Sequence, residues 1–184
     1  MDARKENEPT SRKNRTTVER KSERELVVTR TFNAPARIVF EAWTKPELLK
    51  RWWAPKSMDM SLLTCEVDAR AGGRYRFVFG FAHDASQTMA FFGKYLEVTP
   101  HSRLVWTNDE QGEGKESITT VTFEEKEGKT LLVMREVHPS KESLDDLAAG
   151  EATHETFDQL DELLVTLGQS GPHAAAAPTP GACS

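Results

Sequence analysis

The chain has 184 residues, enough for one ordinary domain with extensions, and its formal net charge is −5. This mild acidity argues against a dedicated nucleic-acid-binding protein, which usually presents a strongly basic face. No apolar run approaches the roughly 20 residues that span a bilayer, and the charged N-terminus is not followed by the apolar stretch of a secretory signal. We therefore expect a cytoplasmic protein that neither binds nucleic acid nor spans a membrane.

Both ends of the chain have compositions typical of disordered segments. Residues 1–24 are rich in charged and polar side chains, and Val18 is their only large aliphatic residue. Such a segment buries too little apolar surface to offset its ordering entropy, so we interpret it as a disordered charged arm in solvent. Contact of this arm with a polyanion or a protein partner is the alternative. Residues 169–184, mainly Ala, Pro, Gly and Ser, are interpreted as a disordered tail, which leaves residues 25–168 as the folded domain.

The first part of this domain predicts one strand and two short helices. Leu26–Phe32 is rich in Val, Thr and Phe, which is typical of a strand. Pro35 suits the first turn of a helix, where its missing N–H is not needed, and an apolar stripe follows it as far as Trp43. Pro46 begins a second short helix, which Pro55 ends.

The rest of the domain predicts a sheet followed by one long helix. The region from Cys65 to His138 is rich in strand patterns, and from Tyr75 to Phe81 aromatic residues alternate with polar or small ones. Residues 151–167 carry one continuous apolar stripe at helical spacing. The predicted order is one strand, two short helices, about six strands and a long C-terminal helix. A curved antiparallel sheet wrapped on that helix buries these faces economically, so we expect an α+β fold.

Two segments carry a resemblance to a known family. The first contains FNAP at Phe32–Pro35, AWTKPE at Ala42–Glu47 and WWAP at Trp52–Pro55; the second is DARAGGRYRF at Asp68–Phe77. Together they resemble the SRPBCC, or START-like, superfamily, and within it the domain related to the activator of heat-shock-protein-ninety ATPase. The resemblance covers nearly all of residues 25–167. It implies a helix-grip fold, as in the birch-pollen allergen, in which the sheet grips the C-terminal helix and encloses a cavity.

Aromatic side chains crowd the middle of the chain. For each of them, ordinary core packing is one explanation. The other is that they line a cavity between the sheet and the C-terminal helix, since small-molecule pockets are mostly apolar with a few placed polar groups. The cavity hypothesis assigns ligand contacts to Trp43, Trp53, Tyr75, Phe77, Phe79, Phe81, Phe92, Tyr95, Trp106, Met134 and Phe157.

Glu136 is the one candidate for acid or base chemistry inside such a cavity. Strand alternation places it on the same face as Met134. A buried carboxylate must be paired or hydrogen-bonded, and Arg30, Arg76 or Arg135 could supply the pair. The alternative is that Glu136 lies in water at the end of its strand.

The sequence contains no motif for a metal, a cofactor or a nucleophile. Its five histidines do not form a cluster at metal-ligand spacing, so we expect no metal and no cofactor. Cys65 and Cys183 are expected to be reduced thiols, with Cys65 a small strand residue and not a nucleophile. Gly72–Gly73 lacks the Lys-Ser/Thr of a phosphate-binding loop and is interpreted as a tight turn or bulge between strands.

Three functions remain open at this stage. We favour a non-enzymatic protein that binds a small apolar or amphipathic ligand in a central cavity. The superfamily resemblance also implies an enzyme similar to polyketide cyclases or dehydratases, with Glu136 as the cavity acid or base. The family resemblance implies a third function, a regulator of a chaperone ATPase or a stress-response interaction protein. The oligomeric state, monomer or dimer, is open as well.

Overall fold

The computed structural model describes residues 14–109, 116–145 and 149–169. The interpretations of residues 1–13 as part of an arm and of residues 170–184 as a tail lie outside these ranges. Within them the chain forms one curved antiparallel sheet in the order β1-β2-β8-β7-β6-β5-β4-β3. The strands are β1 (Thr17–Ser22), β2 (Glu25–Phe32), β3 (Met60–Val67), β4 (Arg74–Phe81), β5 (Asp84–Thr99), β6 (Arg103–Asn108), β7 (Ser117–Lys126) and β8 (Lys129–Val137).

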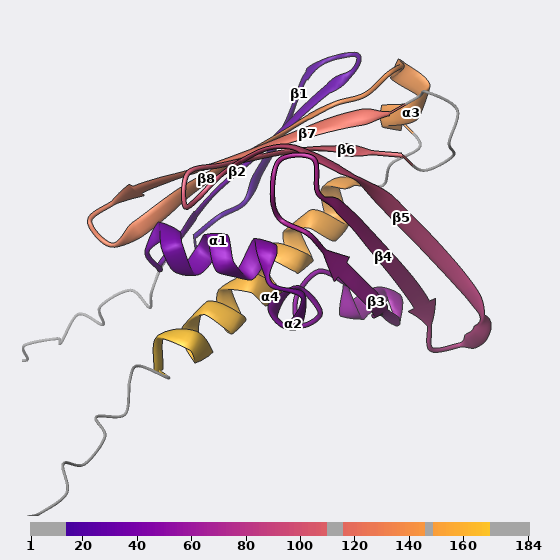
Figure 1. The fold of residues 1–184 in the computed structure, drawn as a ribbon, viewed down its shortest axis with the longest axis horizontal. Helices are drawn as coiled ribbons and strands as arrows, with labels where there is room; N and C mark the ends of the chain where they lie inside the picture. The colour runs from indigo at the N-terminus through magenta and orange to yellow at the C-terminus, as the bar shows by residue number, and fades with distance from the viewer. Residues whose placement is uncertain (1–13, 110–115, 146–148, 170–184) are drawn as a thin grey trace, which may run out of the picture.

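The helices that matter for the site lie together on one side of the sheet. Figure 1 shows α1, α2 and α4 beneath the curved sheet, with β3, β4 and β5 folding down as an arm beside them. The helices are α1 (Ala36–Thr44), α2 (Pro46–Leu49), the 3₁₀ turn η1 (Lys56–Met58), α3 (Lys141–Asp145) and α4 (Ala149–Gln169). This arrangement is the predicted α+β helix-grip fold.

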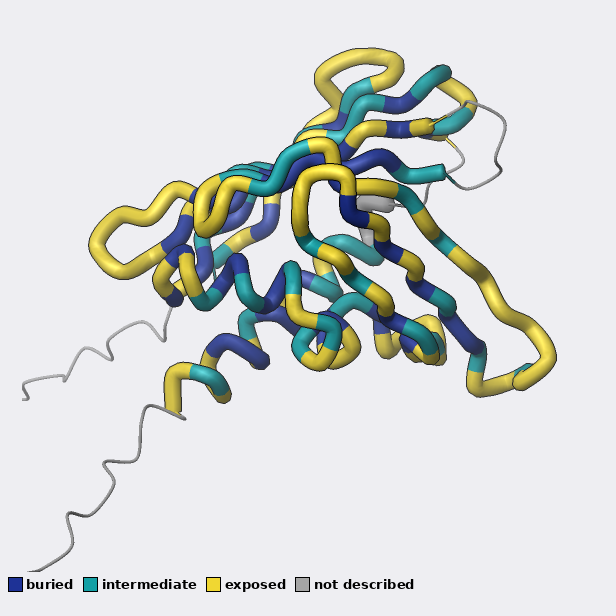
Figure 2. Tube along the Cα trace, viewed as in Figure 1, coloured by how far each residue is buried: buried dark blue, intermediate teal, exposed yellow. Residues whose placement is uncertain are grey.

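The hydrophobic core fills the space between the sheet and α4. Every second residue of β2 is buried, as expected for a strand with one face on the core. On α4, Phe157, Leu160 and Leu164 are buried, which is the predicted stripe. The inner faces of the central strands are buried along their length, whereas the far end of the β4–β5 hairpin is exposed (Figure 2).

Strand β1 corrects the predicted start of the domain. Residues 17–22 belong to the segment interpreted as a disordered arm, yet they pair antiparallel with β2, with Thr17 opposite Thr29. Five of the six β1 residues are exposed, so the strand carries no apolar alternation to reveal it. Backbone pairing holds it, and Arg20 Nη1 forms an ion pair with Asp145 Oδ1 at 2.5 Å. The folded domain therefore begins before residue 25.

Candidate functional site

A cavity of about 150 Å³ lies between the sheet and the helices, and we call it the central cavity. Its walls come from α1, the segment after α2, the inner faces of β6, β7 and β8, and the first half of α4. It is lined by Trp43, Trp52, Trp53, Trp106, Asn108, Thr119, Met134, Glu136, Thr153, Thr156 and Phe157. All four tryptophans of the sequence take part.

The four tryptophans form one cluster around Trp43. Ring centroids lie 5.0 Å from Trp43 to Trp52, 5.3 Å to Trp53 and 6.1 Å to Trp106. The interplanar angles of these pairs run from 46° to 84°, so the rings form walls at angles to one another and not a stack. Gln159 on α4 fixes the Trp52–Ala54 segment, because its Nε2 donates to the carbonyl oxygens of Trp52 and Ala54 at 2.9 and 2.8 Å.

Asn108 organises the polar part of the wall. Its Oδ1 accepts hydrogen bonds from Tyr75 OH at 2.7 Å and from Trp106 Nε1 at 3.1 Å. Its Nδ2 donates to Ser117 Oγ at 3.2 Å and to Thr119 Oγ1 at 2.9 Å. The Asn108 side chain thus fills its hydrogen-bonding capacity and locks the Trp106 ring in place.

Glu136 lies on the cavity wall, as the inward alternation of β8 predicts. Its side chain is 21% exposed, and His138 Nε2 lies 3.7 Å from its Oε2. The predicted arginine partners are wrong. Arg30 is buried and pairs with Asp158 and Asp161 of α4, whereas Arg135 pairs with Glu25 at 2.6 Å.

Arg76 is likewise no partner of Glu136. Its strand neighbours set its direction, because it lies directly opposite Phe92 and next to the inward-facing Tyr75 and Phe77. Strand alternation therefore places Arg76 on the outer face of the sheet, whereas Glu136 faces the central cavity. The strand pairing of β4 with β5 therefore excludes a contact between Arg76 and Glu136.

The structure divides the eleven predicted cavity residues into three groups. Trp43, Trp53, Trp106, Met134 and Phe157 line the central cavity. Tyr75, Phe77 and Tyr95 join three of these tryptophans around a neighbouring void of only about 10 Å³, which is packed core. Phe79, Phe81 and Phe92 line neither space.

The positions of Phe79, Phe81 and Phe92 explain why they do not line the cavity. Phe79 packs edge-on against Phe91 at 5.5 Å, well along the β3–β5 arm. Phe81 ends β4 and contacts the ring of His83. Phe92 lies opposite Arg76 in the ladder, on the outer face, and is 38% exposed. Alternation on β4 was predicted correctly, but the arm carries these residues away from the helices.

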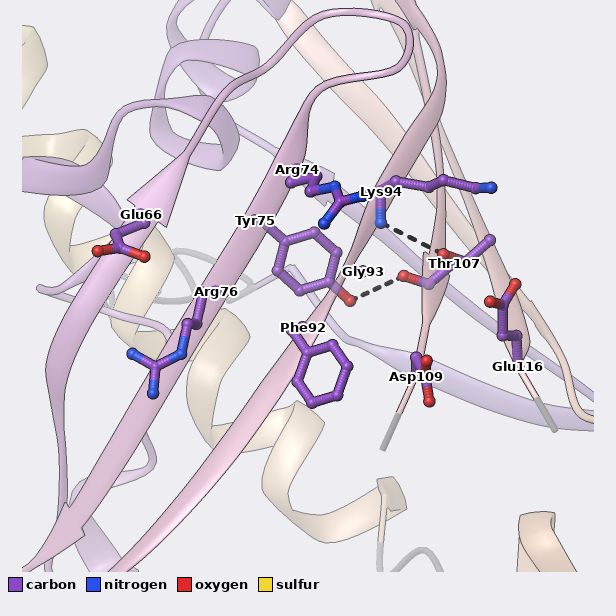
Figure 3. Close-up of a pocket in the computed structure, with 10 residues that line it drawn as sticks. All are labelled: Glu66, Arg74, Tyr75, Arg76, Phe92, Gly93, Lys94, Thr107, Asp109 and Glu116. Atoms are coloured by element: carbon purple, nitrogen blue, oxygen red, sulfur yellow. Dashed lines mark hydrogen bonds between the residues drawn. The ribbon is translucent and has the colours of Figure 1, made fainter. Parts of the chain in front are cut away.

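A larger hollow of about 520 Å³ lies on the other side of this sheet region (Figure 3). It is lined by Glu66, Arg74, Tyr75, Arg76, Phe92, Gly93, Lys94, Thr107, Asp109 and Glu116. Acidic and basic side chains are equally frequent in this lining, so it carries no net formal charge. It is a surface depression beside the interruption of the β5–β6 pairing between Tyr95↔Trp106 and Phe92↔Asp109.

The Tyr75 hydroxyl links β4 to β6 beside this point. Its one O–H is shared between Asn108 Oδ1 and the carbonyl oxygen of Thr107, which lies 2.9 Å away, and the Lys94 N–H donates to Thr107 Oγ1 at 3.3 Å (Figure 3). Side chains therefore satisfy backbone groups that a regular β5–β6 ladder would pair. Gly93 lies beside this point, where a Cβ atom would lie 1.8 Å from Thr107 O.

The family follows from a match that spans most of the domain. Residues 33–165 match the model of the family described as Activator of Hsp90 ATPase homolog 1-like protein. The chain belongs to this family. Among curated proteins, none matches the sequence.

Solved structures of bacterial proteins share the fold. A protein from Rhodobacter sphaeroides is 25% identical with a TM-score of 0.73, over 83% of this chain and 99% of that one. A protein from Nitrosomonas europaea is 26% identical with a TM-score of 0.71, over 80% and 98%. An AHSA1-like protein from Aeromonas hydrophila is 20% identical with a TM-score of 0.62, over 81% and 99%, and shows the fold alone.

Sequence reasoning missed five residues of the central cavity: Trp52, Asn108, Thr119, Thr153 and Thr156. Thr119 could have been found, because it precedes Val121 and Phe123 on the buried face of one strand. Asn108 ends β6, and only the fold shows that it lines the cavity.

Neither a metal site nor a membrane helix is found in the described part of the chain. No group of three or more His, Cys, Asp or Glu side chains there could hold a metal ion. Across residues 14–109, 116–145 and 149–169, no helix is both long and apolar enough to cross a bilayer.

Cys65 is a buried thiol, and burial raises its pKa to about 11. At pH 8 this lowers the thiolate fraction about 100-fold relative to an ordinary thiol. In a Cys183→Ser variant, we expect iodoacetamide to alkylate Cys65 of the native protein about 100-fold more slowly than in urea, as measured by mass spectrometry. Equal rates would show that the thiol is accessible and ionised.

Proposed function

We propose that the protein binds a small amphipathic molecule in the central cavity. The observation that carries this proposal is an open space of about 150 Å³ inside an otherwise closely packed domain. Protein interiors hold few voids larger than a water molecule. An engineered cavity of similar volume in another protein binds benzene. Glu136 and Trp53 are partly exposed, which gives a ligand access from solvent.

The dimensions of the cavity limit the ligand. Pockets for drug-sized molecules usually measure about 300–1,000 Å³, so this one suits a molecule about the size of a single ring. Tryptophan and phenylalanine rings supply the apolar part of the wall, and Glu136, Asn108 and three threonines supply the polar part. The ligand is therefore small and carries at least one polar group.

An enzyme is the second candidate, and the Glu136–His138 pair favours it. A carboxylate on the cavity wall with an imidazole 3.7 Å away could act as an acid and base on a bound molecule. His138 is only 4% exposed, and its buried Nε2 has no hydrogen-bond partner among the described residues. A chaperone partner and a cytoplasmic location remain predictions.

Calorimetric titration with phenol tests the binding proposal. We expect saturable binding with a Kd of about 1 mM or tighter, equivalent to −4.1 kcal/mol. Met134→Trp fills the cavity and should weaken binding at least about tenfold, because Met134 lines the wall. Met89→Trp is the matched control, since Met89 is 40% exposed on β5 and should leave the affinity unchanged. Absence of saturable binding, or equal loss in both variants, would contradict the proposal.

A further inference from the structure

We propose that the central cavity selects a small organic cation, an alkylammonium ion that also carries an oxygen atom. This inference rests on the proposed function and adds the charge and the chemical class of the ligand. Three features of the cavity carry it: a single acidic side chain, four tryptophan rings and one buried N–H without a partner.

The charge of the lining is entirely negative. Glu136 is the only charged residue among the eleven that line the cavity, and none of them is Lys or Arg. Its candidate arginine partners are engaged elsewhere, with Arg30 bound to α4 and Arg135 bound to Glu25. His138 is the only basic side chain paired with Glu136 in the described residues, and it is charged only when protonated. A half-buried carboxylate in such a wall is stabilised by a cationic ligand.

The tryptophans provide the second half of a cation site. The faces of aromatic rings attract cations, Trp most strongly, and clustered rings are the usual means of recognising quaternary ammonium groups. Trp52 Nε1 donates to Ala42 O at 3.0 Å and Trp106 Nε1 donates to Asn108 Oδ1 at 3.1 Å, so both rings are held in fixed orientations. A quaternary ammonium ion has no N–H to satisfy, which suits a wall made of rings and one carboxylate.

Trp43 supplies the third feature. It is 3% exposed, lines the cavity, and its Nε1 is buried with no hydrogen-bond partner among the described residues. A buried donor without an acceptor costs free energy, and a ligand oxygen that reached it from the cavity would satisfy it. An oxygen close to the ammonium group, as in an amino alcohol, therefore complements Trp43 and Glu136 together.

The size of the cavity identifies a free small molecule as the source of the ammonium group. Choline has only one more non-hydrogen atom than benzene, which a cavity of about this volume accommodates. An acyl chain does not fit in about 150 Å³, so a phospholipid headgroup would have to enter while its chains remained outside. We expect binding of free choline and no binding of phosphatidylcholine vesicles.

Calorimetry with choline and its neutral carbon isostere, 3,3-dimethylbutan-1-ol, tests the inference. The two molecules share shape and hydroxyl group and differ in charge. We expect choline to bind the native protein at least about tenfold more tightly than the alcohol. Glu136→Gln should weaken choline binding about tenfold or more and weaken binding of the alcohol by a much smaller factor. Glu124→Gln, an exposed change on β7, is the control and should alter neither affinity.

The outcomes separate this inference from the proposed function. Equal affinity for choline and the alcohol would overturn cation selectivity and leave small-molecule binding intact. If the native protein bound none of phenol, choline and the alcohol, both the inference and the proposed function would be overturned. Binding to phosphatidylcholine vesicles without binding of free choline would overturn the free cation as ligand. Phenol binding by Glu136→Gln would confirm that this variant is folded.

Discussion

Replacing Leu160 with alanine is expected to lower the free energy of unfolding by about 2–5 kcal/mol, the usual cost of removing a large core side chain. Leu160 is fully buried on α4, at the centre of the stripe that packs against the sheet. Urea titration followed by circular dichroism measures the change. The size of the effect reports how well the surrounding core can collapse into the space left behind.

Val165 provides the control on the same helix. Its side chain is 61% exposed, so Val165→Ala should change stability by no more than about 0.5 kcal/mol. A small effect at both positions would mean that α4 does not close the core, which contradicts the helix-grip arrangement.

Gly93→Ala is expected to cost about 3 kcal/mol or more. The added Cβ atom would lie 1.8 Å from the carbonyl oxygen of Thr107 and 2.9 Å from Cε1 of Tyr75. The first obstacle is backbone, so strands β5 and β6 must separate at the point where the hydroxyl of Tyr75, on β4, bonds Thr107 of β6. Thermal unfolding measures the loss, and hydrogen exchange of β5 and β6 amides shows whether it begins at this point.

Gly80→Ala is the matched control for this prediction. Its added Cβ would meet only the Leu63 side chain, at 2.6 Å, and Leu63 is 56% exposed and free to turn away. We expect a cost below about 1 kcal/mol. Similar costs at both glycines would show that the sheet tolerates the Gly93 contact by a small backbone shift.

Helices and strands with a strong apolar periodicity in the sequence were predicted well, and those without one were missed. The stripe of α4 and the alternation of β4 each reflect one buried face, which the sequence records directly. β1 was missed because a mostly exposed edge strand leaves no apolar pattern. The five-residue α3 was missed because it is too short to display one.

The residues of the central cavity were predicted only in part. Strand alternation shows which residues face inward, but it does not show which of them surround empty space. Tyr75 and Trp106 both face inward, yet only Trp106 borders the central cavity, because the sheet bends between β4 and β6. Glu136 was assigned correctly to the inner face. Its contact with His138 was not predicted, since His138 approaches it from beyond the strand end.

The position of α4 in the chain has a consequence for synthesis on the ribosome. β2 pairs with β8 from Glu25↔Val137 to Phe32↔Thr130, across about a hundred residues, and such distant pairing is slow to form. α4 follows every strand, and its Phe157 completes a cavity whose first wall is Trp43. A nascent chain therefore lacks the central cavity until translation has passed Phe157, and a molecule that bound there would stabilise only the finished domain.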